Sequence, residues 1–188
     1  FGGDKDIFGM RRGREENPFL GLRGIRFSLE HREVFKTQLC AILRAAVHGH
    51  LHLLHPMIND IHEFEAATGI LEEAKDDLRK RGLDYSDSLP VGCMVETPCS
   101  ALTLDLLAEV CQFVCLGTND LLQYLLAVDR LNPQVQHMYM PGQPAVLRFL
   151  RDTVDSARSL NLPLSVCGEM ASDPIYAPFF LGLGVTDL

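Results

Sequence analysis

The chain has 188 residues, 47% of them hydrophobic, and a formal net charge of -8. This negative charge argues against non-specific binding to nucleic acid. Its apolar runs are all shorter than the roughly 20 residues that cross a bilayer, and the amino-terminal sequence lacks the pattern of a signal peptide. We therefore expect one domain with a sizeable core, no nucleic-acid partner and no membrane insertion.

The six cysteines form no CxxC pair and have no spacing typical of a disulfide scaffold. Most of them fall inside apolar runs, where a free cysteine behaves as a small buried hydrophobe. This usage favours a reducing compartment, and the sequence therefore predicts a cytoplasmic location.

The chain begins with loop composition, followed by a long polar segment and a helix. Residues 6–23 contain several glycines and arginines and are too many for an ordinary connector, and loops of that length tend to be functional. Ser28 is expected to cap a helix that ends at Gly49. Its apolar face would be formed by Phe35, Leu39, Ile42, Leu43 and Ala46.

A strand and a second helix are expected next. Residues 50–58, HLHLLHPMI, alternate well enough to form a strand. Asp60 and Glu63 have the spacing of a capping box, and the helix that they begin would end at Gly82.

The central stretch, residues 91–120, predicts a strand-helix-strand unit. Its first strand ends at Glu96, its helix runs from Ser100 to Val110, and its second apolar run leads into residues 117–120, GTND.

Three more helices and one strand are expected after it. Leu121 to Val128 should be helical, Pro144 opens a helix, and Asp173 begins a last helix that extends to Leu183. Between these helices, residues 164–167 form a strand and residues 168–170 a loop.

Strands and helices thus alternate without a hairpin signal, which predicts an α/β fold with a parallel sheet. The four strands, near 50–58, 91–96, 113–117 and 164–167, amount to about half of an eight-stranded barrel. Another strand is expected to begin at residues 185–188, so the sequence reads as a barrel that is cut at both ends.

Polar side chains stand where several of these strands end. The carboxyl ends of parallel strands open on one side of a sheet, so Glu96 and Asp120 are expected to face one cavity. Two convergent carboxylates with nothing basic beside them suit a hard divalent cation, and Mg2+ in particular is held by one or two carboxylates plus substrate oxygens. Asn119 and Cys167 occupy similar positions. The alternative is that these residues only cap the helices that follow.

Cys167 precedes a glycine at a strand end, where a thiol can approach a ligand closely and transfer a proton. The alternative role, an inert buried cysteine, fits Cys93 and Cys115 better because they lie within strands.

Three arginines, Arg23, Arg26 and Arg130, are candidates for binding phosphate or carboxylate, which the guanidinium fork does bidentately. Each could equally be a solvated surface residue. The cluster of His48, His50, His52 and His55 is not spaced to complete a zinc site, and we expect a structural role for it.

Five segments carry a family resemblance: GGDK (2–5), EENPFLGLRGIR (15–26), HPMI (55–58), residues 91–132 and VCGEMASDP (166–174). They closely resemble the C-terminal domain of enzyme I of the bacterial phosphotransferase system, the phosphoenolpyruvate-protein phosphotransferases. Pyruvate phosphate dikinase and phosphoenolpyruvate (PEP) synthase share motifs similar to GTNDL and CGE, but differ around VETP and YLLAVDR.

The resemblance implies a (β/α)8 barrel of the PEP/pyruvate type that binds PEP and Mg2+ and forms a homodimer. Residues 1–188 would be a single partial domain holding about half to two-thirds of the barrel. By position, the resemblance makes Glu96 and Asp120 the metal ligands, Arg23, Asn119 and Arg130 the substrate-binding residues, and Cys167 the proton donor to the enolate carbon.

The resemblance also implies parts that this sequence does not contain. Two more substrate arginines would precede GGDK, a closing strand would follow Asp187, and a separate N-terminal domain would carry the phosphorylated histidine and bind the carrier protein HPr or its nitrogen-branch paralogue. We expect the parent protein to transfer the phosphoryl group and release pyruvate, and the 188-residue piece alone to be inactive.

The alternatives are a dikinase or synthase barrel, a Mg2+ lyase barrel that stabilises a pyruvate enolate, and an inactive dimerisation or regulatory fragment. The sequence does not distinguish sugar uptake from nitrogen regulation.

Overall fold

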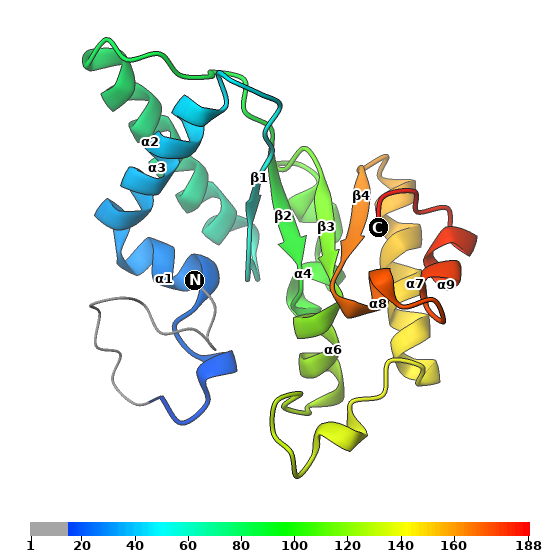
Figure 1. The fold of residues 1–188 in the computed structure, drawn as a ribbon. Helices are drawn as coiled ribbons and strands as arrows, with labels where there is room; N and C mark the ends of the chain where they lie inside the picture. The colour runs from blue at the N-terminus through cyan, green and yellow to red at the C-terminus, as the bar shows by residue number, and fades with distance from the viewer. Residues whose placement is uncertain (1–14) are drawn as a thin grey trace.

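Four parallel strands lie side by side in a computed structural model of the chain, which describes residues 15–188 (Figure 1). The strands are β1 (Leu53–His55), β2 (Val91–Val95), β3 (Val114–Gly117) and β4 (Leu164–Cys167). They follow one another across the sheet in chain order. This confirms the α/β class, because consecutive parallel neighbours joined by helices are the repeating unit of a (β/α)8 barrel.

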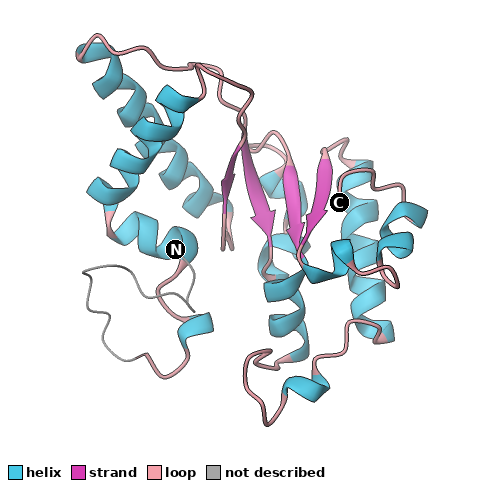
Figure 2. Ribbon diagram, viewed as in Figure 1, coloured by secondary structure: helices cyan, strands magenta, loops and turns pink. Residues whose placement is uncertain are grey.

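Helices lie at both edges of the sheet and at the arrowhead ends of its middle strands (Figure 2). Helices α1 to α3 lie beside β1, and α7 to α9 lie beside β4 (Figure 1). The α-helices are α1 (Gly24–Glu30), α2 (Arg32–Ala45), α3 (Ile61–Lys80), α4 (Pro98–Leu102), α5 (Leu104–Leu107), α6 (Thr118–Leu126), α7 (Pro144–Ser159), α8 (Glu169–Ser172) and α9 (Ala177–Gly182). Two short 3-10 helices are η1 (Pro18–Leu20) and η2 (Gln136–Met138).

The predicted cap at Ser28 is wrong. Helix α1 already begins at Gly24, and the Ser28 hydroxyl donates to the Gly24 carbonyl oxygen one turn back at 3.2 Å. The backbone of Gly24 has φ +55, and a Cβ there would come within 2.8 Å of the Met57 side chain. Glycine thus lets the chain turn into the helix against Met57.

The predicted cap at Asp60 is confirmed. Its carboxylate accepts from the backbone N–H groups of His62 and Glu63, at 2.8 and 3.0 Å. The Glu63 carboxylate reaches back to the N–H of Asn59 rather than to that of Asp60, at 2.7 Å. The N–H groups of His62 and Glu63, in the first turn of α3, therefore both have an acceptor. The helix ends at Lys80, just before Gly82.

Several other helix boundaries differ from expectation, among them the start of α9 at Ala177 rather than Asp173. The single helix predicted over 100–110 is two helices, α4 and α5, separated at Thr103. Helix α6 begins at Thr118, three residues early, and α8 occupies part of the predicted loop at 168–170. These shifts place the polar residues that follow β3 and β4 in the first turns of helices.

The chain ends beside β4, where the backbone N–H of Val166 donates to the Asp187 carbonyl oxygen at 2.9 Å. GGDK and residues 6–14 of the long polar segment lie outside the described residues. None of the helices found between residues 15 and 188 is long and apolar enough to cross a membrane.

Candidate functional site

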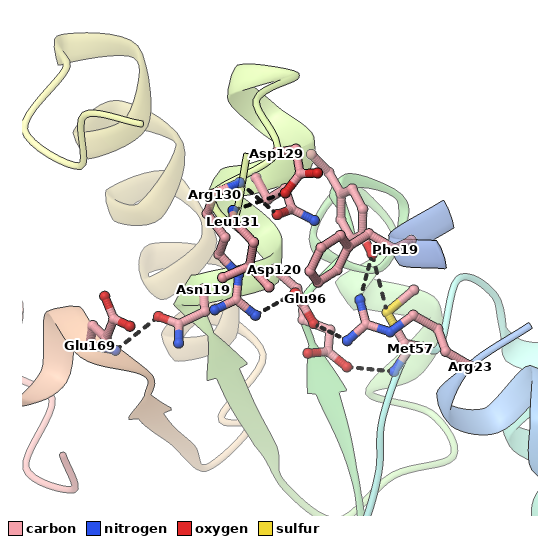
Figure 3. Close-up of polar contacts among 12 residues, drawn as sticks. Phe19, Arg23, Met57, Glu96, Asn119, Asp120, Asp129, Arg130, Leu131 and Glu169 are labelled. Carbon is pink, nitrogen blue, oxygen red and sulfur yellow. Dashed lines mark hydrogen bonds and ion pairs between the residues drawn. The ribbon is translucent and has the colours of Figure 1, made fainter. Parts of the chain in front are cut away.

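Two buried carboxylates meet at the carboxyl ends of β2 and β3, as Figure 3 shows. Glu96 directly follows β2, and Asp120 lies in the first turn of α6, just after β3. Each residue is only 6% exposed. The two side chains therefore converge as predicted, because neighbouring parallel strands end at the same edge of the sheet.

Asp120 binds two arginines, one with each carboxylate oxygen. Its Oδ2 lies 2.6 Å from Nη2 of Arg23, and its Oδ1 lies 3.2 Å from Nη2 of Arg130. The expectation that nothing basic stands beside these carboxylates is thus wrong. Arg23 comes from a segment 97 residues away, so its approach depends on the fold and cannot be read from spacing.

Glu96 has a different environment. Its Oε1 accepts from the backbone N–H of Met57 at 2.7 Å, and Met57 has an unusual positive φ of 59. Burial, followed by the negative charge of Asp120, raises the pKa of Glu96 to about 7. Glu96 therefore binds a proton more readily than an exposed glutamate does.

Both arginines form ion pairs with Asp120, but each also has a side-chain N–H group without a hydrogen-bond acceptor within residues 15–188. Arg23 is 7% exposed and is the N-cap residue of α1. The Nε atoms of both Arg23 and Arg130 are buried, and neither has a hydrogen-bond acceptor among residues 15–188. An unpaired buried donor is costly, and an anionic ligand that accepted from these N–H groups would remove that cost.

Arg130 follows the end of α6. Its backbone N–H donates to Gln123 Oε1 at 3.1 Å, and Ala127, in the left-handed conformation with φ 54, ends the helix. This turn directs the chain back so that the Arg130 side chain reaches Asp120.

Asn119 links two of the strand ends. Its side-chain oxygen accepts from the backbone N–H of Glu169 at 2.9 Å, and its carbonyl oxygen accepts from the Tyr139 hydroxyl at 3.0 Å. Gly168, with φ +98, makes this close approach possible: a Cβ would lie 2.4 Å from Thr118 Oγ1 and 2.9 Å from Asn119 Oδ1.

Cys167 is the last residue of β4 and is partly buried. Its carbonyl oxygen accepts from Thr118 Oγ1 at 2.8 Å, which fixes it against the start of α6. A hydrogen bond with Cys115, together with burial, raises the pKa of the Cys167 thiol. The Cys167 thiol therefore keeps its proton at neutral pH.

The remaining sequence candidates lie outside this group. Arg26 donates to the carbonyl oxygens of Leu20 and Gly21, at 2.9 and 3.2 Å, and so supports the turn after η1. Among the described residues, no three or more histidine, cysteine or acidic side chains are grouped as a metal cluster. His55 is buried between Phe35 and Phe64, and this burial lowers its pKa to about 4.

Three residues of the site were not singled out from the sequence: Phe19, Met57 and Tyr124. Their side chains or backbone groups contact Arg23 or Glu96. They also line a neighbouring cavity of about 610 Å³, which Glu96 and Asp120 do not line. The sequence signal for them is that each lies in a segment that carries the family resemblance: Phe19 in EENPFLGLRGIR, Met57 in HPMI and Tyr124 in residues 91–132.

Comparison with known proteins gives consistent results. Residues 1–188 match the family described as PEP-utilising enzyme, PEP-binding domain. Over 99% of its length, the chain is 45% identical to a phosphoenolpyruvate-protein phosphotransferase of Priestia megaterium, 44% to that of Bacillus subtilis (strain 168) and 41% to that of Staphylococcus aureus. The chain spans about a third of the length of these relatives, 32% of the first.

A solved structure supports the fold. A citrate lyase from Burkholderia xenovorans LB400 is similar with a TM-score of 0.52 and 21% identity, over 72% of this chain and 43% of that one. At this identity the likeness concerns the fold alone. Together with the parallel sheet, it agrees with a partial barrel of the PEP/pyruvate type.

Proposed function

Because the chain belongs to the PEP-utilising enzymes, through their PEP-binding domain, we propose that it is the PEP-binding part of a phosphoenolpyruvate-protein phosphotransferase. That activity moves the phosphoryl group of PEP to a protein histidine and releases pyruvate. The observation that carries the proposal is the pair of arginines on Asp120, buried Arg23 and half-buried Arg130, whose buried Nε–H groups have no acceptor within residues 15–188.

The arginines would bind the phosphate and carboxylate groups of PEP. A guanidinium matches either group with two parallel N–H donors, and phosphoryl transfer depends mainly on positioning and charge neutralisation. Asn119 would contribute its side-chain amide from the first turn of α6, next to Asp120. The trianionic character of PEP explains why more than one arginine is useful in a site that also holds two carboxylates.

The carboxylates of Glu96 and Asp120 would hold Mg2+. The donor set fits this ion, because both groups offer hard oxygen atoms and the repulsion between them is part of what raises the pKa of Glu96. When bound, Mg2+ supplies positive charge that neutralises substrate oxygens and orients them.

Cys167 would protonate the enolate that remains after the phosphoryl group has left. The thiol proton moves to the methylene carbon, which becomes the methyl group of pyruvate, and Cys167 is left as a thiolate. Its raised pKa keeps the proton on sulfur until then.

We extend the proposal to the parent protein. Residues 1–188 would be one partial barrel domain, and a separate N-terminal domain would carry the phosphorylated histidine and bind HPr or its nitrogen-branch paralogue. The parent protein would form a homodimer and lie in the cytoplasm. All six cysteines of the sequence are free thiols in the structure, which suits a reducing compartment.

The experiment uses the full-length protein with PEP, Mg2+ and HPr. Cys167→Ala should retain phosphorylation of the protein histidine but lose most pyruvate formation, since the enolate lacks its acid. Cys99→Ala, which changes an exposed thiol, is the matched control. Absence of any PEP-dependent phosphorylation in the unchanged protein would refute the proposed function, and full pyruvate formation by Cys167→Ala would favour a lyase-type barrel.

A further inference from the structure

Two aromatic residues that the proposed mechanism does not use surround the arginines. The Phe19 ring, in η1, lies 5.4 Å from Cζ of Arg23 and 5.7 Å from Cζ of Arg130. Both distances are within the range of cation–π attraction. Phe19 is therefore shared by the two cations that flank Asp120, as Figure 3 shows.

The Tyr124 hydroxyl, in α6, joins three separate segments. It accepts from Nη1 of Arg23 at 3.0 Å and donates to the carbonyl oxygen of Phe19 at 2.5 Å. It also lies 3.8 Å from Sδ of Met57, the residue whose N–H holds Glu96. Burial raises the pKa of Tyr124, so the hydroxyl keeps the proton that it gives to Phe19.

Two of the three side-chain nitrogens of Arg23 are therefore held by hydrogen bonds to other residues. Nη1 points to Tyr124 and Nη2 to Asp120, while the Phe19 ring centre lies 5.4 Å from Cζ. A planar cation fixed at three points cannot rotate without breaking a contact. Among its three side-chain nitrogens, Nε is the one that is buried without an acceptor within residues 15–188.

We propose that Phe19 and Tyr124 are positioning residues: they form an arginine clamp that holds Arg23, and through Phe19 also Arg130, in the orientation that receives the anionic groups of the ligand. This inference rests on the proposed function for the identity of the ligand. Since a clamp of this kind lowers the entropy cost of ordering two long side chains, its contribution appears in binding rather than in the chemical step.

The clamp predicts a division between binding and turnover. In the full-length protein, Tyr124→Phe removes one hydrogen bond to a charged group and should raise the KM for PEP about tenfold, with kcat within about twofold of the unchanged protein. Phe19→Leu should also raise KM. Tyr85→Phe is the matched control, because it removes a hydroxyl that interacts with another arginine, Arg79, at the end of α3. It should leave KM unchanged.

A second readout does not depend on activity. The arginine Nε–H signals in NMR spectra of the protein without PEP report guanidinium motion and the ring current of Phe19. Tyr124→Phe should broaden or shift the Arg23 signal, and Phe19→Leu should shift the signals of both arginines. Unchanged arginine signals, or a KM for Tyr124→Phe equal to that of Tyr85→Phe, would overturn the clamp. If the signals change but the unchanged protein does not bind PEP, the clamp stands and the proposed function fails.

Discussion

The two carboxylates of the site should respond to neutralisation in different ways. Asp120 forms ion pairs with Arg23 and Arg130, and the Arg23 and Asp120 side chains are only 8% and 7% exposed. Replacing Asp120 by Asn leaves two neighbouring cations without a counter-charge in a buried place. Removing one partner of a buried pair costs about 3–5 kcal/mol. The nearby charge of Glu96 partly compensates, so we expect a loss of about 3 kcal/mol in the free energy of unfolding.

Glu96→Gln should cost less than about 1 kcal/mol, because the amide oxygen can still accept from the Met57 N–H and the repulsion with Asp120 disappears. The assay is urea unfolding with a chelator present, comparing midpoints at equal m-values. Glu96→Gln is the matched control for Asp120→Asn, since both variants replace one buried carboxylate by its amide. If the two variants lose equal stability, the view that Asp120 is the counter-charge of both arginines is refuted.

Three other changes test the framework of the site. His55 has a pKa of about 4 in the folded chain against 6.5 when exposed, so only the unfolded state gains a proton as the pH falls from 6.5 towards 4, and stability should drop by up to about 3 kcal/mol. Urea titrations from pH 7.5 to pH 4.5 should show this drop in the unchanged protein but a smaller one in His55→Phe. Equal losses of unfolding free energy in the two proteins over this pH range would contradict the prediction. Gly168→Ala forces a Cβ against Thr118 and Asn119 at a φ of +98 and should cost about 2–4 kcal/mol; a melting temperature equal to that of the unchanged protein would be the contrary result. Asp60→Ala removes the cap of α3 and should cost about 1 kcal/mol, measurable as a shift in the urea midpoint, and no shift would mean that water replaces the cap.

The elements of the fold were largely accessible from the sequence because they depend on local patterns. The apolar runs at 91–96, 113–117 and 164–167 correspond within a residue or so to β2, β3 and β4. The spacing of Asp60 and Glu63 predicts the cap of α3 that the structure contains. Boundaries that depend on tertiary packing were not predicted: Gly24 begins α1 because it packs on Met57, and β1 is limited to Leu53–His55.

The sequence by itself determined which chemical groups stand at the ends of the strands: Glu96, Asn119, Asp120 and Cys167 follow from periodicity and parallel alternation. Only the tertiary structure decided how these groups are neutralised and held. Arg23 meets Asp120 across 97 residues, and Tyr124 meets the Phe19 carbonyl across 105. Such pairings arise when separate helices pack on one sheet, and no local spacing records them. The physical reason is that charge and hydrogen bonding act over a few ångströms in space, whatever the distance along the chain.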